Sequence, residues 1–192
     1  LEKNALPLID AEGEFCGYRG TDRDITQRRV HELTGLPNRS LFCEHITALL
    51  QQLNGQGLPL VIFVFDIERL SAINDSFGRL AGDKLLQLVA ERMRTMLRNA
   101  PAMAHLGGGV FGVAFTDLVD AQDAAHLLRS EISRLFAEPF ALAGHVMRLT
   151  ARSGISNHPQ DGDDAETLLQ RAEAALRSAK ETGEKYLHYQ IQ

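Results

Sequence analysis

The sequence predicts an α/β (α+β) domain in which helices flank a mixed central β-sheet. Residues 60–67 form an almost uninterrupted apolar run, which is typical of a strand buried on both faces. Apolar residues recur at helical spacing in residues 40–53 and 165–182. A glycine-rich stretch at residues 106–111 lies between two apolar runs and predicts the tip of a β-hairpin. Strands and helices that alternate in this way over 192 residues indicate one domain with a short appendage.

Composition excludes several classes of partner. The chain is 44% hydrophobic and 23% charged, which suits a folded domain with a core. Its net charge of -5 lacks the basic surplus that nucleic-acid binding needs. The longest apolar run, Leu58–Phe65, is far shorter than a membrane span, so we expect no direct membrane contact. Cys16 and Cys43 match no metal or redox spacing, so we expect a reducing, cytoplasmic location. Because the sequence starts at Leu1 rather than at an initiator Met, we expect it to be part of a longer protein.

The first part of the chain predicts strands followed by helices. Residues 6–20 look like two short strands around an Asp-Ala-Glu-Gly turn. A helix is expected over residues 25–32, with Asp24 or Thr26 as its cap. A loop containing Gly and Pro then breaks the chain before the helix of residues 40–53.

The remaining elements follow the buried strand in a regular alternation. We expect, in order, helix 70–77, helix 83–97, hairpin 102–115, helix 120–136, a hairpin of residues 138–142 and 145–151, helix 165–182 and strand 186–189. Asp83 is placed to cap the second of these helices, and Gly183 to end the last.

The N-terminal residues carry a first resemblance. The strand end Gly17–Gly20 and the following Arg23–Thr26 resemble the closing strands of a PAS sensory domain, which lead into a signalling helix. The resemblance covers only the last strand pair, so the PAS ligand pocket lies outside it. It predicts three parts: residues 1–24 as the end of a PAS domain, residues 25–32 as a signalling linker helix, and residues 33–192 as the main domain.

Four motifs of the main domain carry a second resemblance. They are Leu33–Arg39, Asp66-Ile67 with Ile73–Asp75, Gly82-Asp83 and the glycine-rich hairpin. Together they resemble the GGDEF domain of diguanylate cyclases, over about residues 33–189. The resemblance implies a fold like the palm of nucleotide polymerases. It also implies a reaction in which two GTP-loaded domains meet and join their substrates into cyclic di-GMP.

The resemblance assigns residues to nucleotide and metal. Such a site needs carboxylates to hold cations near the triphosphate, and backbone amides to cradle the phosphates. By resemblance, the metal ligands would be Asp66 and the carbonyl of Ile67, the guanine contacts Asn74 and Asp83, and the phosphate cradle Gly107 and Gly108. Mg²⁺ accompanying GTP is the only cofactor that it implies.

The chain departs from the family where the chemistry needs charge. Gly109 and Val110 occupy the acidic third and fourth hairpin positions, of which one is a shared metal ligand and the other serves catalysis. Ser71, which is neutral, stands near the position at which the family usually has a phosphate-binding lysine. Arg98 matches the Arg-x-x-Asp product-inhibition site, but Pro101 replaces its Asp. The resemblance therefore implies no catalytic residue, a vestigial metal site and a degenerate inhibitory site.

Simpler interpretations of these residues stay open. Asp83 is equally explained as a helix cap, worth about 1 kcal/mol without any ligand. Asn74 would also satisfy local backbone groups. Glu68 shares a face with Asp66 in an extended strand and would then help to hold one cation. Arg152 stands where the family tends to have Ser.

The sequence thus predicts a catalytically inactive GGDEF domain that regulates a multidomain cyclic di-GMP signalling protein. A PAS domain upstream and an EAL phosphodiesterase domain downstream are expected in cis, the latter by analogy alone. Two versions remain open: a GTP-binding module that uses Asn74 and Asp83, or a ligand-free scaffold that forms a homodimer. The competing hypothesis is an active diguanylate cyclase with an atypical site.

Overall fold

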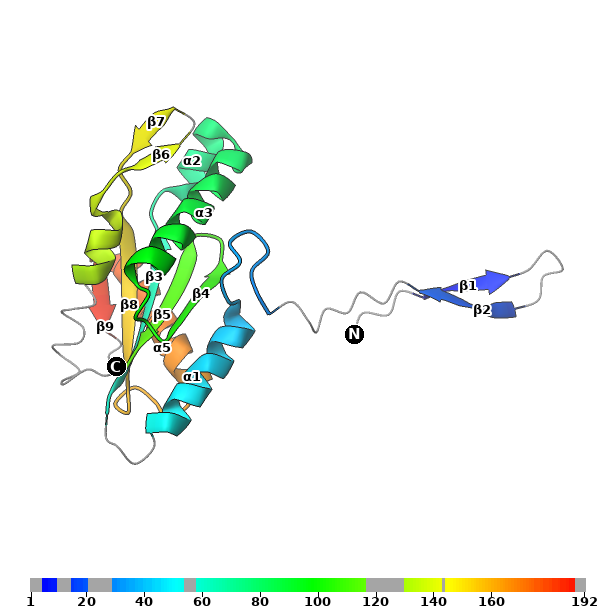
Figure 1. The fold of residues 1–192 in the computed structure, drawn as a ribbon, viewed down its shortest axis with the longest axis horizontal. Helices are drawn as coiled ribbons and strands as arrows, with labels where there is room; N and C mark the ends of the chain where they lie inside the picture. The colour runs from blue at the N-terminus through cyan, green and yellow to red at the C-terminus, as the bar shows by residue number, and fades with distance from the viewer. Residues whose placement is uncertain are drawn as a thin grey trace.

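The computed structural model describes residues 29–53, 58–116, 130–142 and 144–188, and the backbone of residues 5–9 and 15–20 (Figure 1). Strands β1 (Ala5–Ile9) and β2 (Phe15–Gly20) pair antiparallel, as the sequence predicts. Their assignment to a PAS domain stays a prediction. Among the described helices, none is both long and apolar enough to cross a membrane.

The main domain is built on a five-stranded mixed sheet, which confirms the predicted fold class. Its strand order is β4-β5-β3-β8-β9. The bounds are Ala102–Gly107 for β4, Val110–Phe115 for β5, Leu60–Ile67 for β3, Ala151–His158 for β8 and Tyr186–His188 for β9. Neighbouring strands are antiparallel except for β8 and β9, which are parallel. The centre of the sheet is β3, which pairs along its length with β5 and β8.

Helices cover both faces of this sheet (Figure 1). Helices α1 (Arg39–Leu53) and α5 (Ala165–Thr182) pack on one face. Helix α3 (Arg79–Met96) and the helical residues 130–137 pack on the other, and α2 (Leu70–Phe77) precedes α3.

The side chains of β3 alternate between the two cores, as the two-residue repeat of a strand requires. Val61, Phe63 and Phe65 join the cluster under α3. Leu60, Ile62 and Val64 join the cluster under α1 and α5. All six are fully buried. The apolar run therefore reflects a strand with a helical layer on each side, which fixes the position of Asp66 at its end.

The helix ends follow from local chemistry. The Asn38 Oδ1 atom accepts from the backbone N–H of Leu41 at 3.0 Å and caps the start of α1. The Asp164 Oδ1 atom accepts from the N–H of Thr167 at 2.9 Å and caps α5. Gly183 ends α5 with a φ of 80°, a left-handed conformation that favours glycine. The predicted end of α5 is confirmed.

Three expectations about elements need correction. Asp83 lies one turn inside α3 rather than at its cap, because the helix begins at Arg79 directly after Gly78. The expected strand over residues 145–151 ends early: β7 (His145–Met147) pairs with β6 (Phe140–Leu142), and β8 starts at Ala151.

The third correction concerns the linker. Residues 29–32 are not helical, and Val30 instead forms a β-bridge with Pro37. Residues 25–28 of the expected linker helix lie outside the described residues. So do residues 120–129 of the helix expected over 120–136, and Tyr189 of the last strand.

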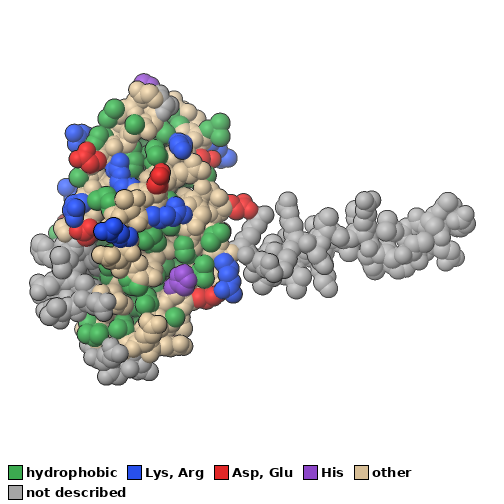
Figure 2. All heavy atoms as spheres, in the orientation of Figure 1, with side chains coloured by type: hydrophobic (Ala, Val, Ile, Leu, Met, Phe, Trp, Pro, Cys, Tyr) green, Lys and Arg blue, Asp and Glu red, His purple; other side chains and the backbone are tan. Residues whose placement is uncertain are grey.

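The charges on the face seen in Figure 2 are mixed. Lys and Arg side chains are interspersed with Asp and Glu, and hydrophobic side chains lie between them. This pattern fits the net charge of -5 and differs from the single-sign basic surface that nucleic-acid binding uses.

Candidate nucleotide site

A cleft of about 510 Å³ lies where the predicted site residues meet. Its walls are the end of β3, the turn into α2, the tip of the β4–β5 hairpin, Arg152 of β8 and Lys180 of α5. Of the six residues assigned to nucleotide and metal, the cleft contains Asp66, Ile67, Asn74 and Gly108. Asp83 and Gly107 do not line it.

Asp66 projects into the cleft from the last part of β3, in register between Val110 of β5 and Arg152 of β8. Its Oδ2 atom forms an ion pair with the Lys180 ammonium group. A Cβ at position 109 would lie 2.6 Å from Oδ1 of Asp66 and 3.5 Å from the Ile67 carbonyl oxygen. The two oxygens that the resemblance assigns to metal therefore converge on Gly109.

The hairpin tip shows which glycines its backbone requires. Gly107 and Gly108 have φ values of 114° and 55°, which side chains other than glycine rarely adopt. Gly109 is not among the glycines with positive φ, so its backbone would accept a side chain. Contact with Asp66 limits what fits there. Val110 packs against the apolar cluster under α1 and α5. Neither position presents an acid to the cleft.

Glu68 contacts Thr150 and Arg152 rather than the cation that we expected it to hold with Asp66. Its Oε1 atom lies 2.6 Å from Nε of Arg152, and its Oε2 atom accepts from the Thr150 hydroxyl at 2.6 Å. The Thr150 hydrogen bond, followed by the one from Arg152, lowers the pKa of the Glu68 carboxyl. Arg152 also donates to the carbonyl of Ala179 at 3.0 Å. Both carboxylate oxygens of Glu68 thus face these partners rather than a cation shared with Asp66.

The residues of the cleft do not fit a pair of divalent cations. Mg²⁺ needs a near-octahedral set of oxygen ligands, which two-metal sites build by sharing carboxylates. Asp66 is ion-paired, and position 109 has no side chain. Within the described ranges, no three His, Cys, Asp or Glu residues are grouped so as to hold a metal ion. Two carboxylates line the cleft against three basic side chains, Arg69, Arg152 and Lys180.

Asn74 lies where α2 contacts α3. A Cβ at position 82 would lie 1.8 Å from its Oδ1 atom, so Gly82 is what lets the two helices approach at this point. Oδ1 is buried and has no hydrogen-bond partner within the part of the chain that the structure describes. A buried acceptor without a donor is costly. Local backbone hydrogen bonding therefore does not explain this oxygen. Asp83 follows Gly82 and is exposed.

The sequence features of the inhibitory site follow the C-terminal end of α3. Arg98 follows the end of that helix and is exposed, as is Pro101 before β4. The degeneracy of this site rests on the Pro101 substitution and stays a prediction.

His105 supports the hairpin tip, a role that the sequence does not reveal. Its ring is buried, with Nε2 2.9 Å from the Gly108 carbonyl oxygen and Nδ1 3.2 Å from the Thr34 hydroxyl. A carbonyl can only accept, so Nε2 carries the proton and Nδ1 accepts from Thr34. The ring also stacks on Phe111 and lies 3.7 Å, centroid to centroid, from the ring of His31.

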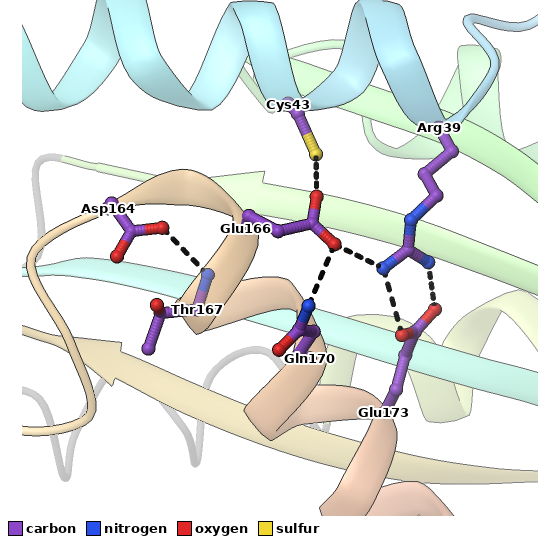
Figure 3. A network of polar contacts seen from close by, with 7 residues as sticks. All are labelled: Arg39, Cys43, Asp164, Glu166, Thr167, Gln170 and Glu173. Carbon is purple, nitrogen blue, oxygen red and sulfur yellow. Dashed lines mark hydrogen bonds and ion pairs between the residues drawn. The ribbon is translucent and has the colours of Figure 1, made fainter.

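A second polar network fixes α5, which carries Lys180 (Figure 3). Arg39 of α1 contacts Glu173 through Nη1 at 2.5 Å and Nη2 at 3.1 Å, and Nη2 also lies 3.1 Å from Glu166. The Cys43 thiol donates to Glu166 at 3.5 Å. Burial, with the Glu166 contact, raises the pKa of Cys43 to about 11, so the thiol stays protonated at neutral pH and is no nucleophile.

Two ion pairs at the cleft were not predicted from the sequence. Lys180 pairs with Asp66, and Arg152 pairs with Glu68, although the sequence places each pair far apart. Two sequence features hinted at these ion pairs. Ala179-Lys180 fits the family pattern, and Arg152 stands at a position where the family usually has Ser. Both contacts depend on α5 and β8 reaching the end of β3.

Comparison with known proteins gives the family. Residues 30–186 match the family described as "Diguanylate cyclase, GGDEF domain". One curated relative is the cyclic di-GMP phosphodiesterase NbdA of Pseudomonas aeruginosa, 37% identical over 155 residues. Another is the bifunctional diguanylate cyclase/cyclic di-GMP phosphodiesterase MucR of the same species, 33% identical over 163 residues. The alignments cover 81% and 84% of this chain, but 20% and 24% of those relatives.

A solved structure supports the same assignment. The isolated GGDEF domain of TpbB (YfiN) from Pseudomonas aeruginosa matches with a TM-score of 0.77 and 29% identity, covering 84% of this chain and 94% of that one. Sheet order, helices and hairpin together are therefore those of this family. Over residues 30–186 the chain belongs to the diguanylate cyclase GGDEF domain family.

Proposed function

We propose that this GGDEF domain binds a guanine nucleotide and does not convert it to cyclic di-GMP, so that it acts as a regulatory domain of a larger signalling protein. The observation that carries the proposal is the hairpin tip. Gly109 faces the carboxylate of Asp66, and Val110 packs against the apolar cluster under α1 and α5, whereas the resemblance expects acids at both positions.

The loss of these acids bears on catalysis more than on binding. Catalytic metal ions contribute several kcal/mol of charge stabilisation in a transition state, and each 1.36 kcal/mol lost slows the reaction tenfold. The guanine contacts and the glycine cradle depend on other residues. Asn74 and Gly108 still line the cleft, and the Oδ1 atom of Asn74 is buried without a partner among the described residues. Binding without turnover is therefore the function that these residues support best.

The relatives suggest the kind of larger protein in which this domain works. NbdA is named a phosphodiesterase and MucR a bifunctional cyclase and phosphodiesterase, and this chain spans about a fifth to a quarter of their length. We propose that the domain likewise works beside other domains, with a PAS domain before it and an EAL domain after it. Nucleotide occupancy would then be passed to those neighbours.

Calorimetric titration of the chain with GTP tests the proposal. We expect saturable heat, and we expect Asn74→Ala to weaken binding about tenfold, which corresponds to about 1.4 kcal/mol. Asp83→Ala tests the second guanine contact. Gln52→Ala, an exposed position on α1, is the matched control and leaves the affinity unchanged. The absence of heat at millimolar GTP would contradict the proposal and favour the ligand-free scaffold.

A further inference from the structure

A groove of about 810 Å³ lies between α2 and the β6–β7 hairpin, at the end of the molecule where Figure 1 draws both. Its helical wall consists of residues that recur at the spacing of one helix face: Arg69, Ala72, Ile73, Ser76 and Phe77. Asn74, which meets Gly82 of α3, does not line it. The groove therefore adjoins the nucleotide cleft but does not include the guanine contact.

The opposite wall runs along the edge of β7 rather than across one of its faces. Residues 145–150 line the groove without a break, and the first three of them form β7. Because the side chains of a strand alternate between two faces, a groove over one face would meet only every second residue. Within the described residues, β7 pairs with β6 alone, and none of the lining residues belongs to β6. The edge of β7 that points away from β6 therefore borders the groove.

This edge has backbone groups to offer. In an antiparallel pair, alternate residues direct their N–H and C=O groups toward the partner strand and away from it. An edge that faces no further strand accepts an extended segment of another chain, which then continues the sheet. We propose that the groove binds an extended acidic segment of a partner protein, and that this segment adds to β7 as a further strand.

Charge selects an acidic occupant. Glu68 is the only acid among the lining residues that the structure describes, and it pairs with Arg152 at 2.6 Å. Arg69 and Arg148 are exposed and form no ion pair within the described ranges. The groove is thus basic in a chain whose net charge is -5. Opposite charge attracts an acidic partner, and like charge disfavours the same groove of a second copy.

Apolar side chains supply the rest of the surface. Phe77 of α2 is 42% exposed, and its ring centroid lies 5.3 Å from that of His145 on β7. Val146 of β7 is 75% exposed. Aromatic and arginine side chains carry most of the binding energy in many protein interfaces. A segment in which acidic and apolar residues alternate would meet both kinds of surface, because successive side chains of a strand point to opposite sides.

Fluorescence anisotropy with a labelled peptide tests the inference. The probe is a short synthetic peptide in which Glu and Val alternate, and the same peptide with Lys in place of Glu is its control. We expect the chain to bind the acidic probe saturably, with an affinity that falls as salt is added. We expect the basic probe to bind about tenfold more weakly or not at all. Failure of the acidic probe to bind, or equal binding of both probes, would overturn the inference.

Methylation of the probe's backbone separates strand addition from attraction by charge. Methyl groups on every second backbone nitrogen remove the donors from one edge of the probe and leave its side chains unchanged. Because a strand presents only one edge to β7, methylation of one set of nitrogens should weaken binding about tenfold, and methylation of the other set should weaken it far less. Equal affinity of the two methylated probes would overturn strand addition.

A pair of variants locates the site on the protein. Arg148→Ala is expected to weaken binding of the acidic probe about tenfold. Arg177→Ala, which removes an exposed charge from α5 outside the groove, is the matched control. Circular dichroism confirms that both variants are folded. Equal affinity of the two variants for the probe would overturn the inference.

Two further measurements separate this inference from other outcomes. Arg148 does not line the nucleotide cleft, so GTP titration of Arg148→Ala should match that of the parent chain. Failure to bind GTP and failure to bind the probe are therefore distinguishable results. Sedimentation of the chain with and without the probe tests the remaining occupant. A dimer that the probe dissociates would show that a second copy fills the groove, and would overturn the inference.

Discussion

Asp66 joins the end of β3 to α5 through its ion pair with Lys180. It stands at the end of the most buried strand of the sheet, and its two oxygens face Lys180 and Gly109. The sequence placed Asp66 at a strand end, and the structure confirms that position. Its partner was not predictable, because Lys180 reaches it only through the docking of α5 on the sheet.

A second single residue, His105, predicts how the stability of the domain depends on pH. Burial lowers the pKa of its imidazole, although its hydrogen bond to the Gly108 carbonyl opposes the shift. An unfolded chain has its histidines near 6.5, so below that pH the unfolded state binds a proton that the folded state does not. The free energy of unfolding should therefore fall as the pH drops through 6.5 toward the folded pKa. The slope is at most about 1.4 kcal/mol per pH unit.

Chemical denaturation between pH 5 and pH 7.5 measures this slope. His105→Gln keeps a donor and an acceptor and removes the titration, so we expect a flatter dependence. His145→Gln, an exposed histidine, is the control and keeps the slope of the parent chain. If His105→Gln and the parent showed the same slope, the buried histidine would not be its source.

At the scale of elements, segments with a strong local pattern were the easiest to predict, and β3 has the predicted bounds of residues 60–67. Helices α2 and α5 have the predicted bounds, because their apolar spacing and their flanking Gly and Asp residues act locally. Strand β8 was missed, because its sequence lacks a clear apolar alternation. Its place in the sheet comes from pairing with β3 and from the close approach of α5 at Gly154.

Gly154 therefore carries a prediction about packing. A Cβ at this position would lie 2.1 Å from the carbonyl oxygen of Ala172 and 2.2 Å from the backbone N of Leu176. Because both atoms belong to the backbone of α5, the helix itself would have to move. We expect Gly154→Ala to lower the free energy of unfolding by about 3 kcal/mol, the upper end of the usual cost of overpacking. Ser178→Ala, exposed on α5, is the control, and denaturant unfolding is the measurement. A loss below about 1 kcal/mol would contradict this packing.

For the whole molecule, the sequence predicted the sheet class and the family, since each depends on patterns that are local or shared by relatives. It did not predict the electrostatics of the cleft. Those depend on Lys180, Arg152 and Glu68, which only the assembled sheet and α5 bring together. Four of the residues that the resemblance names line one cleft, and tertiary contacts determine the sign of the charge there.

Product formation tests the account most directly. The chain is incubated with GTP and Mg²⁺ or Mn²⁺, beside an active diguanylate cyclase as a positive control, and the products are separated by liquid chromatography. Because Gly109 and Val110 leave Asp66 without a second carboxylate, we predict that GTP is recovered unchanged while the control makes cyclic di-GMP. Cyclic di-GMP formed by this chain above the level of a blank would contradict the account and identify the domain as a cyclase with an atypical site.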